Sequence, residues 1–226
     1  MELDVVDVGT MGYGECWVLQ QRLFEEAIAQ KAVGEKPSQR VVLVEHTPVY
    51  TLGKSGKESN LLVAEEFLKS LGAEFFHIDR GGDITFHGPG QIVCYPILDL
   101  EQLGIGLRRY IEILEEAVIR TVAHYGINAE RLEGATGVWL CDRDESGVPK
   151  NWRKICAIGV RASHFVTMHG LALNVATDLK WFTMINPCGF VDKGVTSINK
   201  EVGECVDFEE VKRLIVENLT KLLTNE

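Results

Sequence analysis

The sequence predicts an α+β (mixed α/β) fold, with a central mixed β-sheet flanked by helices. Its 226 residues suit one domain, with two small domains as the outside case. Hydrophobic residues make up 46% and charged residues 25%, as in a globular protein, and no apolar run reaches the roughly eighteen residues of a membrane span. Strand-like and helix-like segments are mixed, and several strands are adjacent in sequence, which favours a mixed sheet. We therefore expect residues 1–226 to form a single domain.

The first half of the chain is expected to begin with a strand at 3–8 and a long helix at 14–32. Apolar residues recur near one face of that helix, as in a helix that packs on a sheet. The segment 40–45 is apolar almost throughout, as in a strand that is covered on both faces. This half also holds expected strands at 49–52, 74–79 and 91–98, a polar loop at 54–60 and a short helix at 64–71.

The second half contains the clearest helix, at 107–125. Tyr110, Leu114 and Val118 lie on one of its faces, and Gly126 ends it. A last helix is expected from Asp207, which begins a pattern like a capping box, to about residue 223. The strands of this half are expected at 127–132, 137–141, 155–162 and 168–176, with a polar loop at 142–153.

The net charge disfavours a general nucleic-acid binder and hides a local asymmetry. Lys and Arg number 23 against 33 Asp and Glu, which gives −10, whereas such binders need a basic surface. Residues 146–177 contain no acid and carry Lys150, Arg153, Lys154 and Arg161. This basic segment either docks an acidic partner or consists of strands that exclude acids because both faces are buried. The two interpretations are compatible.

The N-terminus and the cysteines both indicate a reducing compartment. Residues 1–4 lack the basic and apolar regions of a secretory signal, so we expect a cytoplasmic protein. The cysteines show neither a CxxC pair nor the His/Cys spacing of a structural zinc site, so we expect reduced thiols and no metal. They are Cys16, Cys94, Cys141, Cys156, Cys188 and Cys205.

Cys188 has different surroundings from the other five. It lies in the run Asn186-Pro187-Cys188-Gly189-Phe190, between Pro and Gly on irregular backbone. This is a poor place for a core residue and a good one for an exposed nucleophile. Cys94 and Cys156 instead lie within apolar strands, where a thiol packs as a small hydrophobic side chain.

A glycine-rich segment follows the strand expected at 74–79. It reads Arg80-Gly81-Gly82-Asp83-Ile84-Thr85-Phe86-His87-Gly88-Pro89-Gly90-Gln91. Paired glycines let a backbone approach a ligand closely, and free N–H groups in such loops can face an anion or a carbonyl oxygen. The pattern is neither a P-loop nor a dinucleotide fingerprint. The alternative is a plain turn, which the clustering of Arg80, Thr85, His87 and Gln91 makes less favourable.

Lys154 and two histidines each allow more than one interpretation. Lys154 opens an apolar strand, either as a solvated edge charge or as an ammonium near a thiol. In the second case it would lower the pKa of the thiol and later pass a proton. His169 begins an apolar run that ends at Asn174, and is either a structural residue or part of a site. His46 stands at a strand end, from which it can approach the same end of the sheet.

Taken in order, these motifs resemble the lipoyl(octanoyl) transferases of lipoate biosynthesis. The resemblance covers nearly the whole chain and is strongest over 40–200. It departs at Cys156, where the family often has Ala, and in the longer loop at 142–153. The shared motifs are RGG-x-x-T-aromatic-H-x-x-GQ at 80–91, Lys154-Ile155 with residues 157–161, the run 169–174, Pro187-Cys188-Gly189 and the run 194–197.

The resemblance implies an acyltransferase related in fold to biotin and lipoate ligases, with no metal and no other cofactor. Octanoyl-acyl carrier protein is the implied donor, and Cys188, assisted by Lys154, forms the acyl-thioester. The implied acceptors are lysines of the lipoyl domains of 2-oxoacid dehydrogenases and of the glycine-cleavage H protein. The residues expected to bind the octanoyl chain are Arg80, Gly81, Gly82, Asp83, Ile84, Thr85, Phe86, His87, Ala157, Ile158, Gly159, Gly170, Leu171 and Ala172, with His169 in a supporting position.

Two other functions remain open at this point. One is an ATP-dependent lipoate or biotin ligase, which would need no cysteine. The other is a non-catalytic module that binds lipoyl domains. For the transferase, the acidic carrier protein is expected to dock on the basic segment and on Arg108 and Arg109. We expect a monomer that binds neither nucleic acid nor a membrane.

Overall fold

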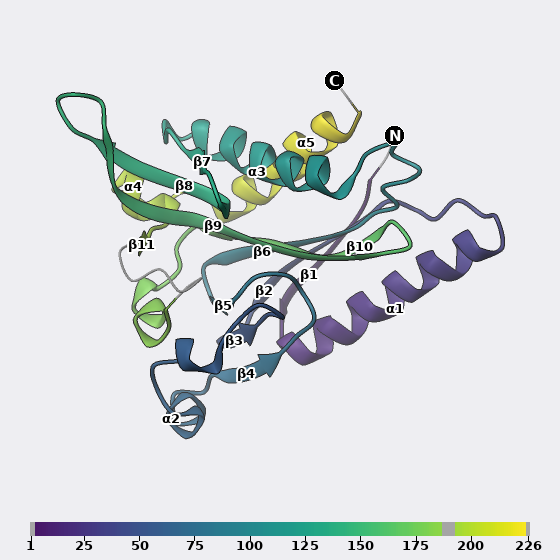
Figure 1. Cartoon of the computed structure of the whole chain (residues 1–226), viewed down its shortest axis with the longest axis horizontal. Coiled ribbons are helices and arrows are strands. Elements are labelled where there is room, and N and C mark those ends of the chain that lie inside the picture. The colour runs from purple at the N-terminus through teal and green to yellow at the C-terminus, as the bar shows by residue number, and fades with distance from the viewer. Residues whose placement is uncertain (1–2, 187–192, 225–226) are drawn as a thin grey trace.

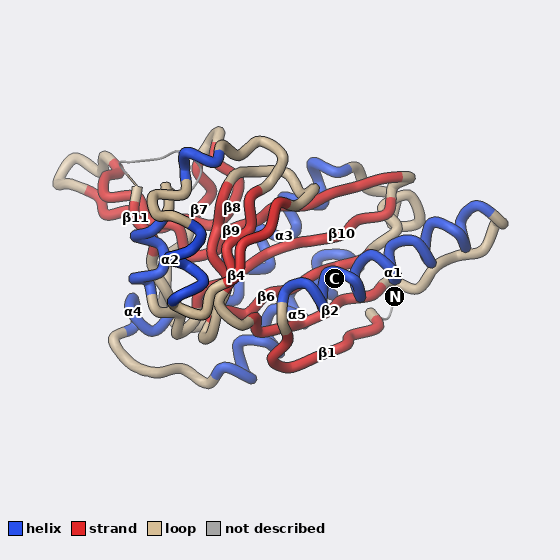
Figure 2. The backbone as a smooth tube through the Cα atoms, turned by 90° about the horizontal axis from the view of Figure 1, so that it is seen from below, coloured by secondary structure: helices blue, strands red, loops and turns tan. Residues whose placement is uncertain are grey.

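The computed structural model describes residues 3–186 and 193–224, and the chain forms three layers. Helices α3 (Leu107–Ala123) and α5 (Phe208–Thr224) lie on one face of a large sheet. Helix α1 (Tyr13–Ala32) and a small second sheet lie on the other face (Figure 1). The view from below shows α1 along one end of that face and the small sheet with α2 (Glu65–Ser70) toward the other (Figure 2). The predicted mixed α+β class is confirmed.

The large sheet mixes parallel and antiparallel pairs, as the sequence predicts. β1 pairs in parallel with β2, and β11 with β9, while the other pairs along the sheet are antiparallel. Its strands in spatial order are β1 (Asp4–Met11), β2 (Arg40–His46), β6 (Gln91–Ile97), β10 (Val166–Asn174), β9 (Pro149–Ser163), β8 (Ala135–Arg143) and β7 (Glu130–Leu132), with β11 (Gly194–Val195) beside β9.

The small sheet shows that the glycine-rich segment is only partly a loop. Its order is β4 (Glu74–His77), β3 (Val49–Leu52) and β5 (Ile84–His87), with β3 central. The run that forms β5 was expected within an irregular segment because its glycines and proline are strong turn signals. Ile84 and Phe86 are nevertheless fully buried, and pairing with β3 makes this short run a strand.

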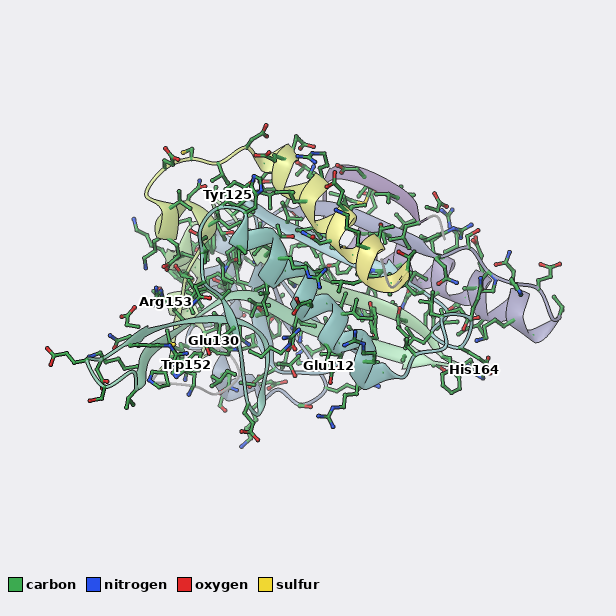
Figure 3. The ribbon with its side chains drawn as sticks, turned by 90° about the horizontal axis from the view of Figure 1, so that it is seen from above. Glu112, Tyr125, Glu130, Trp152, Arg153 and His164 are labelled. Atoms are coloured by element: carbon green, nitrogen blue, oxygen red, sulfur yellow. The ribbon has the colours of Figure 1, made fainter. Side chains whose placement is uncertain are left out.

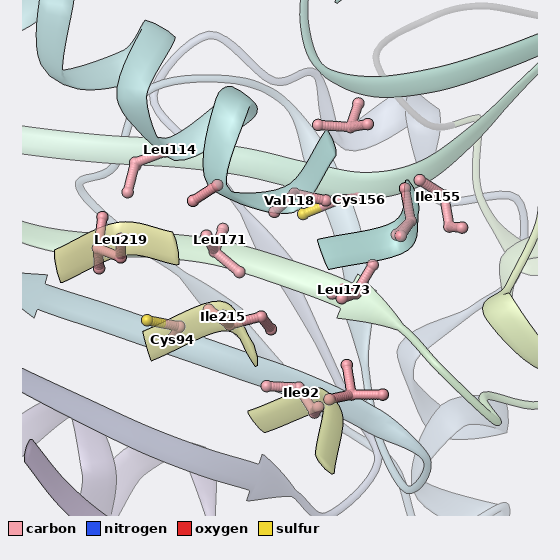
Figure 4. Close-up of a cluster of buried hydrophobic side chains, with 14 of the residues drawn as sticks. Ile92, Cys94, Leu114, Val118, Ile155, Cys156, Leu171, Leu173, Ile215 and Leu219 are labelled. Atoms are coloured by element: carbon pink, nitrogen blue, oxygen red, sulfur yellow. The ribbon is translucent and has the colours of Figure 1, made fainter. Parts of the chain in front are cut away.

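The main apolar core lies between the large sheet and the helices α3 and α5. Residues from both helices and from β6, β9 and β10 meet there, including Ile92, Leu114, Cys156, Leu173 and Ile215 (Figure 4). Cys94 and Cys156 pack in this core, as predicted. The short helices are α4 (Ile198–Val202) and the 3₁₀ turns η1 (Glu58–Asn60) and η2 (Leu179–Met184).

The prediction of a polar loop at 142–153 is wrong for most of that range. Strands β8 and β9 continue through it as an exposed two-stranded arm, at the upper left of Figure 1, and turn only near Gly147. Asp142 pairs across the arm with Lys150 and also accepts hydrogen bonds from Asn151 and Arg153. The arm has no apolar face, so no hydrophobic alternation marks it in the sequence. Among the described residues, no helix is long and apolar enough to cross a membrane.

Candidate active site

A trough with a floor of small residues lies on the sheet face that carries α1 and the small sheet. Ala157 of β9 pairs with Ala172 of β10, and Gly159 pairs with Gly170. A Cβ on Gly170 would lie 2.1 Å from the Cys94 carbonyl oxygen, so glycine is required there. The four residues line a cavity of about 280 Å³. Alternation along a strand places 157 with 159, and 170 with 172, on one face, so the floor runs along the strands.

Arg80 closes over one end of this floor. Its guanidinium donates from Nη2 to the Thr51 carbonyl oxygen and to Thr51 Oγ1, both at 2.9 Å. Gly81 N donates to the Val160 carbonyl oxygen at 2.9 Å, which attaches the segment to β9. A Cβ on Gly159 would lie 2.9 Å from Arg80 Cδ, so the absent side chain of Gly159 makes room for Arg80. The glycines therefore serve the close packing of backbone against an arginine.

A buried hydrogen-bond chain joins the glycine-rich segment to β10. His87 Nδ1 lies 2.8 Å from Gln91 Oε1, and Gln91 Nε2 donates to Asn174 Oδ1 at 2.9 Å. Asn174 Nδ2 then donates to the Thr196 carbonyl oxygen at 3.0 Å. Burial lowers the pKa of His87 to about 3, so its imidazole is neutral near pH 7. A neutral, fully engaged ring suits a positioning role better than proton transfer.

His169 occupies a strained position in the same cavity. Its φ is 60°, which is rare for a residue with a side chain, and it is 2% exposed. His169 Nε2 lies 3.0 Å from Asp79 Oδ1, and Asp79 also forms an ion pair with Arg161. Burial lowers the pKa of His169, and the hydrogen bond to Asp79 opposes that shift. The backbone amide of His169 donates to Gln20 of α1, so contacts from two elements hold the strained residue.

Lys154 lies at the other end of the floor. It is 8% exposed, and its Nζ donates to the Thr136 carbonyl oxygen at 3.2 Å. The same Nζ lies 4.5 Å from the centroid of the Trp139 ring, a cation–π distance. The ammonium is therefore directed into the cavity and is not a solvated strand-edge charge.

The cavity brings together most of the residues that the sequence singled out. Gly81 and Phe86 do not line it: Gly81 bonds to β9, and Phe86 stacks on Trp181 with ring centroids 5.1 Å apart. Cys188 lies outside the described residues. The predicted residues that line the cavity are Arg80, Gly82, Asp83, Ile84, Thr85, His87, Lys154, Ala157, Ile158, Gly159, His169, Gly170, Leu171 and Ala172.

Sequence reasoning missed residues that reach the cavity from distant elements. Tyr13 is the first residue of α1, and no local pattern marks it as a lining residue. Tyr95 lies on β6, and its hydroxyl is 2.9 Å from His46 Nε2. His46 approaches this end of the sheet, as predicted. It contacts the lining residues Tyr13 and Tyr95 but does not itself line the cavity. Asp79 directly precedes Arg80, and its contact with His169 depends on the fold alone.

The basic segment contributes little free positive charge to the surface. Arg153, labelled in Figure 3, donates from Nε and Nη2 to Glu201 at 2.7 Å each and from Nη1 to Asp142. Arg161 pairs with Asp79, and Lys154 points into the cavity. β10 is buried along its whole length. Burial therefore explains most of the absence of Asp and Glu from residues 146–177. Among the described residues, Lys150 is the exposed basic residue of this segment that forms no ion pair.

Four of the five thiols of the described residues are poor nucleophiles, and the fifth, Cys205, is exposed. Burial raises the pKa of Cys16 and of Cys94 to about 12, and it raises the pKa of Cys156 further. Burial raises the pKa of Cys141, and so does the Glu130 carboxylate, to which its thiol donates a hydrogen bond. Within residues 3–186 and 193–224, no group of three or more His, Cys, Asp and Glu side chains is arranged to hold a metal ion.

Comparison with known proteins finds similar chains over nearly the whole length of this one. A family model described as the lipoyl protein ligase A/B catalytic domain matches residues 13–220. The octanoyltransferase of Bacteroides fragilis is 56% identical over 225 residues, which cover 99% of this chain and 100% of that protein. The octanoyltransferase of Flavobacterium johnsoniae is 49% identical over 232 residues, covering 100% of this chain and 98% of that protein.

Solved structures support the fold. A lipoate-protein ligase A bound with ATP has a TM-score of 0.68 at 16% identity, covering 99% of this chain and 86% of that chain. Biotin protein ligase from Aquifex aeolicus in complex with biotin and ATP has a TM-score of 0.55 at 13% identity, covering 99% and 71%. At such identities the likeness concerns the arrangement of the elements.

Proposed function

We propose a two-step acyl transfer for this chain, which belongs to the lipoyl protein ligase A/B catalytic domain family and, within it, to the octanoyltransferases. The donor is octanoyl-acyl carrier protein, and the acceptor is a lysine of a lipoyl domain or of the glycine-cleavage H protein. Residues 1–226 act as one catalytic domain. The observation that carries the proposal is the buried Lys154 ammonium at one end of a trough with a floor of small residues.

In the first step, the Cys188 thiolate attacks the thioester carbonyl of the donor. The new C–S bond forms a tetrahedral intermediate, which collapses with loss of the carrier protein's thiolate. Lys154 supplies the charge that favours the Cys188 thiolate and then a proton for the leaving thiolate. One thioester replaces another, so the step is close to isoenergetic and consumes no ATP.

In the second step, the acceptor lysine attacks the Cys188 thioester as a free amine. Lys154, left neutral by the first step, takes a proton from the incoming ammonium. The C–N bond forms, the C–S bond breaks, and Cys188 leaves as a thiolate beside the restored ammonium. The second proton that the acceptor nitrogen loses as it becomes an amide passes to water, so the overall transfer releases one proton. The product amide is more stable than the thioester, and this difference drives the overall transfer.

The trough supports a preference for an acyl chain of limited length. Two alanines and two glycines leave space along the floor, and Arg80 limits its length at one end. Burial contributes about 0.8 kcal/mol per methylene, so a chain that stops short of Arg80 loses binding free energy. A longer chain must displace a guanidinium that three hydrogen bonds hold in place.

Docking of the acidic carrier protein is proposed on the β8–β9 arm, with Lys150 as its basic contact. Arg153 is already paired with Glu201. Arg108 and Arg109 lie in the first turn of α3, at the end of the molecule where the β9–β10 hairpin turns (Figures 1 and 3). Nine residues of β9 separate Lys154 from that turn, about 30 Å of strand. These two arginines therefore do not fit a docking surface around Lys154.

Intact-mass measurement tests the proposed function. The protein is incubated with octanoyl-acyl carrier protein without ATP, and an octanoyl adduct is expected. The adduct should be absent in Cys188→Ala and present in Cys156→Ala, the matched variant of a buried thiol. An ATP-dependent ligase would retain activity in Cys188→Ala, and a non-catalytic binding module would form no adduct at all.

The oligomeric state and the location are further predictions for this chain. A monomer is expected, and light scattering after size exclusion should give the mass of one chain. A cytoplasmic location is expected as well, and fractionation of cells that express the tagged protein checks it.

A further inference from the structure

Glu115 is a buried carboxylate close to Lys154 that the proposed mechanism does not use. It lies on α3, which packs across β8 and β9, and its side chain is 9% exposed. Its Oε1 accepts from Gly137 N at 3.1 Å, and its Oε2 accepts from Arg131 Nε at 3.0 Å. Burying a carboxylate is costly unless it is paired, and here both oxygens have donors. One donor is a backbone amide beside the trough.

That amide belongs to the peptide unit whose carbonyl accepts a hydrogen bond from Lys154. Gly137 N–H and the Thr136 carbonyl are the two polar groups of one peptide bond, and in a trans peptide they point in opposite directions. Glu115 therefore holds one side of a rigid plane, and Lys154 Nζ lies 3.2 Å from the oxygen on the other side. Fixing the direction of the N–H fixes the direction of the C=O.

The surrounding backbone leaves this peptide little support from the sheet itself. The pairing of β8 with β9 shifts register between Val138 and Trp139. Gly137 has a φ of 126°, and a Cβ there would lie 2.6 Å from the Cys156 carbonyl oxygen. Trp139 Nε1 donates to the Ala135 carbonyl oxygen at 2.9 Å, a second restraint on the same short run. The irregular pairing of β8 with β9 does not fix residues 135–139, so side chains hold this run in place.

We propose that Glu115 is a positioning residue for Lys154 and acts through the Gly137 amide and the Thr136 carbonyl. The inference rests on the proposed function, in which the Lys154 ammonium must meet the reacting groups. A lysine has a flexible four-carbon side chain, and a fixed acceptor at its end selects one rotamer. Both hydrogen bonds of the peptide have a charged partner, so each strengthens the other.

Single-turnover acylation by octanoyl-acyl carrier protein tests the proposal. Glu115→Ala should lower the maximal rate constant by about tenfold to a hundredfold, as expected for a displaced catalytic group, with little change in the half-saturating donor concentration. Glu115→Gln keeps an oxygen for Gly137 N–H but loses the ion pair with Arg131. It should therefore recover part of the rate.

The matched control is Glu116→Ala. Glu116 is the next residue on α3, and it also binds Arg131, but it makes no contact with the Gly137 amide. Its rate constant should equal that of the wild type. The proposal is overturned if Glu115→Ala and Glu116→Ala lower the rate constant equally, or if the Ala and Gln variants of Glu115 do so. It is also overturned if only the half-saturating donor concentration changes.

Trp139→Phe provides a second variant in case Glu115→Ala does not fold. It keeps an aromatic face for the ammonium but removes the donor to the Ala135 carbonyl, and the acylation rate constant should fall several-fold. An unchanged rate constant would contradict the idea that this run must be held. If the wild type itself forms no adduct, the proposed function fails; if the wild type reacts and the variants match it, only this inference fails.

Discussion

The two faces of the large sheet differ around the cavity, although the same strands build both. One face is apolar under α3 and α5. The other, which we call the polar face, has an apolar cluster under α1 and polar side chains around the cavity. Along β10, Leu173 belongs to the apolar core under α3 and α5, whereas its neighbours Ala172 and Asn174 face the opposite side. On that opposite side, hydrogen bonds join imidazole, amide and guanidinium groups around the cavity. Strand alternation therefore lets one residue contribute to folding and its neighbour to chemistry.

The polar face is also the less completely satisfied of the two. Within the described part of the chain, four buried side-chain atoms have no hydrogen-bond partner. Tyr13 Oη, Trp17 Nε1 and Gln20 Nε2 belong to α1, which covers that face, and only Tyr110 Oη belongs to α3 on the other. His169 holds its strained φ there as well. Such costs gather at functional sites, where the remainder of the fold compensates for them. The apolar face supplies that compensation through close packing.

The largest expected difference comes from replacing a buried lysine on either face. Lys154→Met should lower the rate constant of octanoyl transfer by about 10²- to 10⁴-fold, because general acid–base assistance is lost. Lys212 on α5 is similarly buried and pairs with Asp7 and Glu209, but it lies away from the trough. Lys212→Met should leave the rate constant unchanged. Steady-state kinetics on both variants, at matched folded fractions, checks the contrast.

Neighbouring residues of β10 provide the next comparison. Leu173→Ala should lower the free energy of unfolding by about 2–5 kcal/mol, because it leaves a cavity in the apolar core, without changing chain-length preference. Ala172→Leu fills the trough opposite Ala157 and should lower the preference for octanoyl over butanoyl donors by about tenfold. Urea unfolding and paired donor assays measure the two effects. An unchanged donor preference in Ala172→Leu would show that the acyl chain does not lie on this floor.

The contrast between the faces also shows what sequence reasoning can reach. Helix α3 follows from its 3.6-residue apolar period and α5 from its start at Asp207, which resembles a capping box, and the site motifs are recognisable because each is contiguous in sequence. The partners within the site are not contiguous: Gln91 bonds to Asn174, 83 residues away, and His169 to Asp79, 90 residues away. The β8–β9 arm was missed for the opposite reason, since its cross-strand partners are polar and leave no periodic signal.

A smaller effect should appear in the dependence of stability on pH. Burial lowers the pKa of His46 to about 4, so the folded protein keeps this imidazole neutral while the unfolded chain protonates near pH 6.5. Its contribution is fully present above pH 6.5 and is lost as the pH falls toward about 4. The loss should be about 1 kcal/mol between pH 6.5 and 5.5.

Unfolding in urea at the two pH values checks this loss. His46→Gln should reduce the pH dependence by about 1 kcal/mol and leave the part that comes from His87 and His169. His77→Gln should not change it, since His77 is 59% exposed. The apolar face contributes no comparable buried histidine among the described residues of its core. A pH dependence that both variants share in full with the wild type would assign it to other groups, such as His87 and His169, whose pKa values burial also lowers.

The smallest expected effect concerns the β8–β9 arm, which belongs to neither face. Lys150→Glu should raise the half-saturating concentration of octanoyl-acyl carrier protein by about two- to fivefold at low salt, because an exposed charge contributes up to about 1 kcal/mol. The effect should vanish as added salt screens the charge, and the maximal rate should not change. Arg153→Glu is the less informative choice, since it breaks the pair with Glu201 and perturbs the fold. Lys221→Glu, an exposed lysine on α5, makes the same change in net charge. If it raises the half-saturating concentration equally, net charge rather than the arm governs docking.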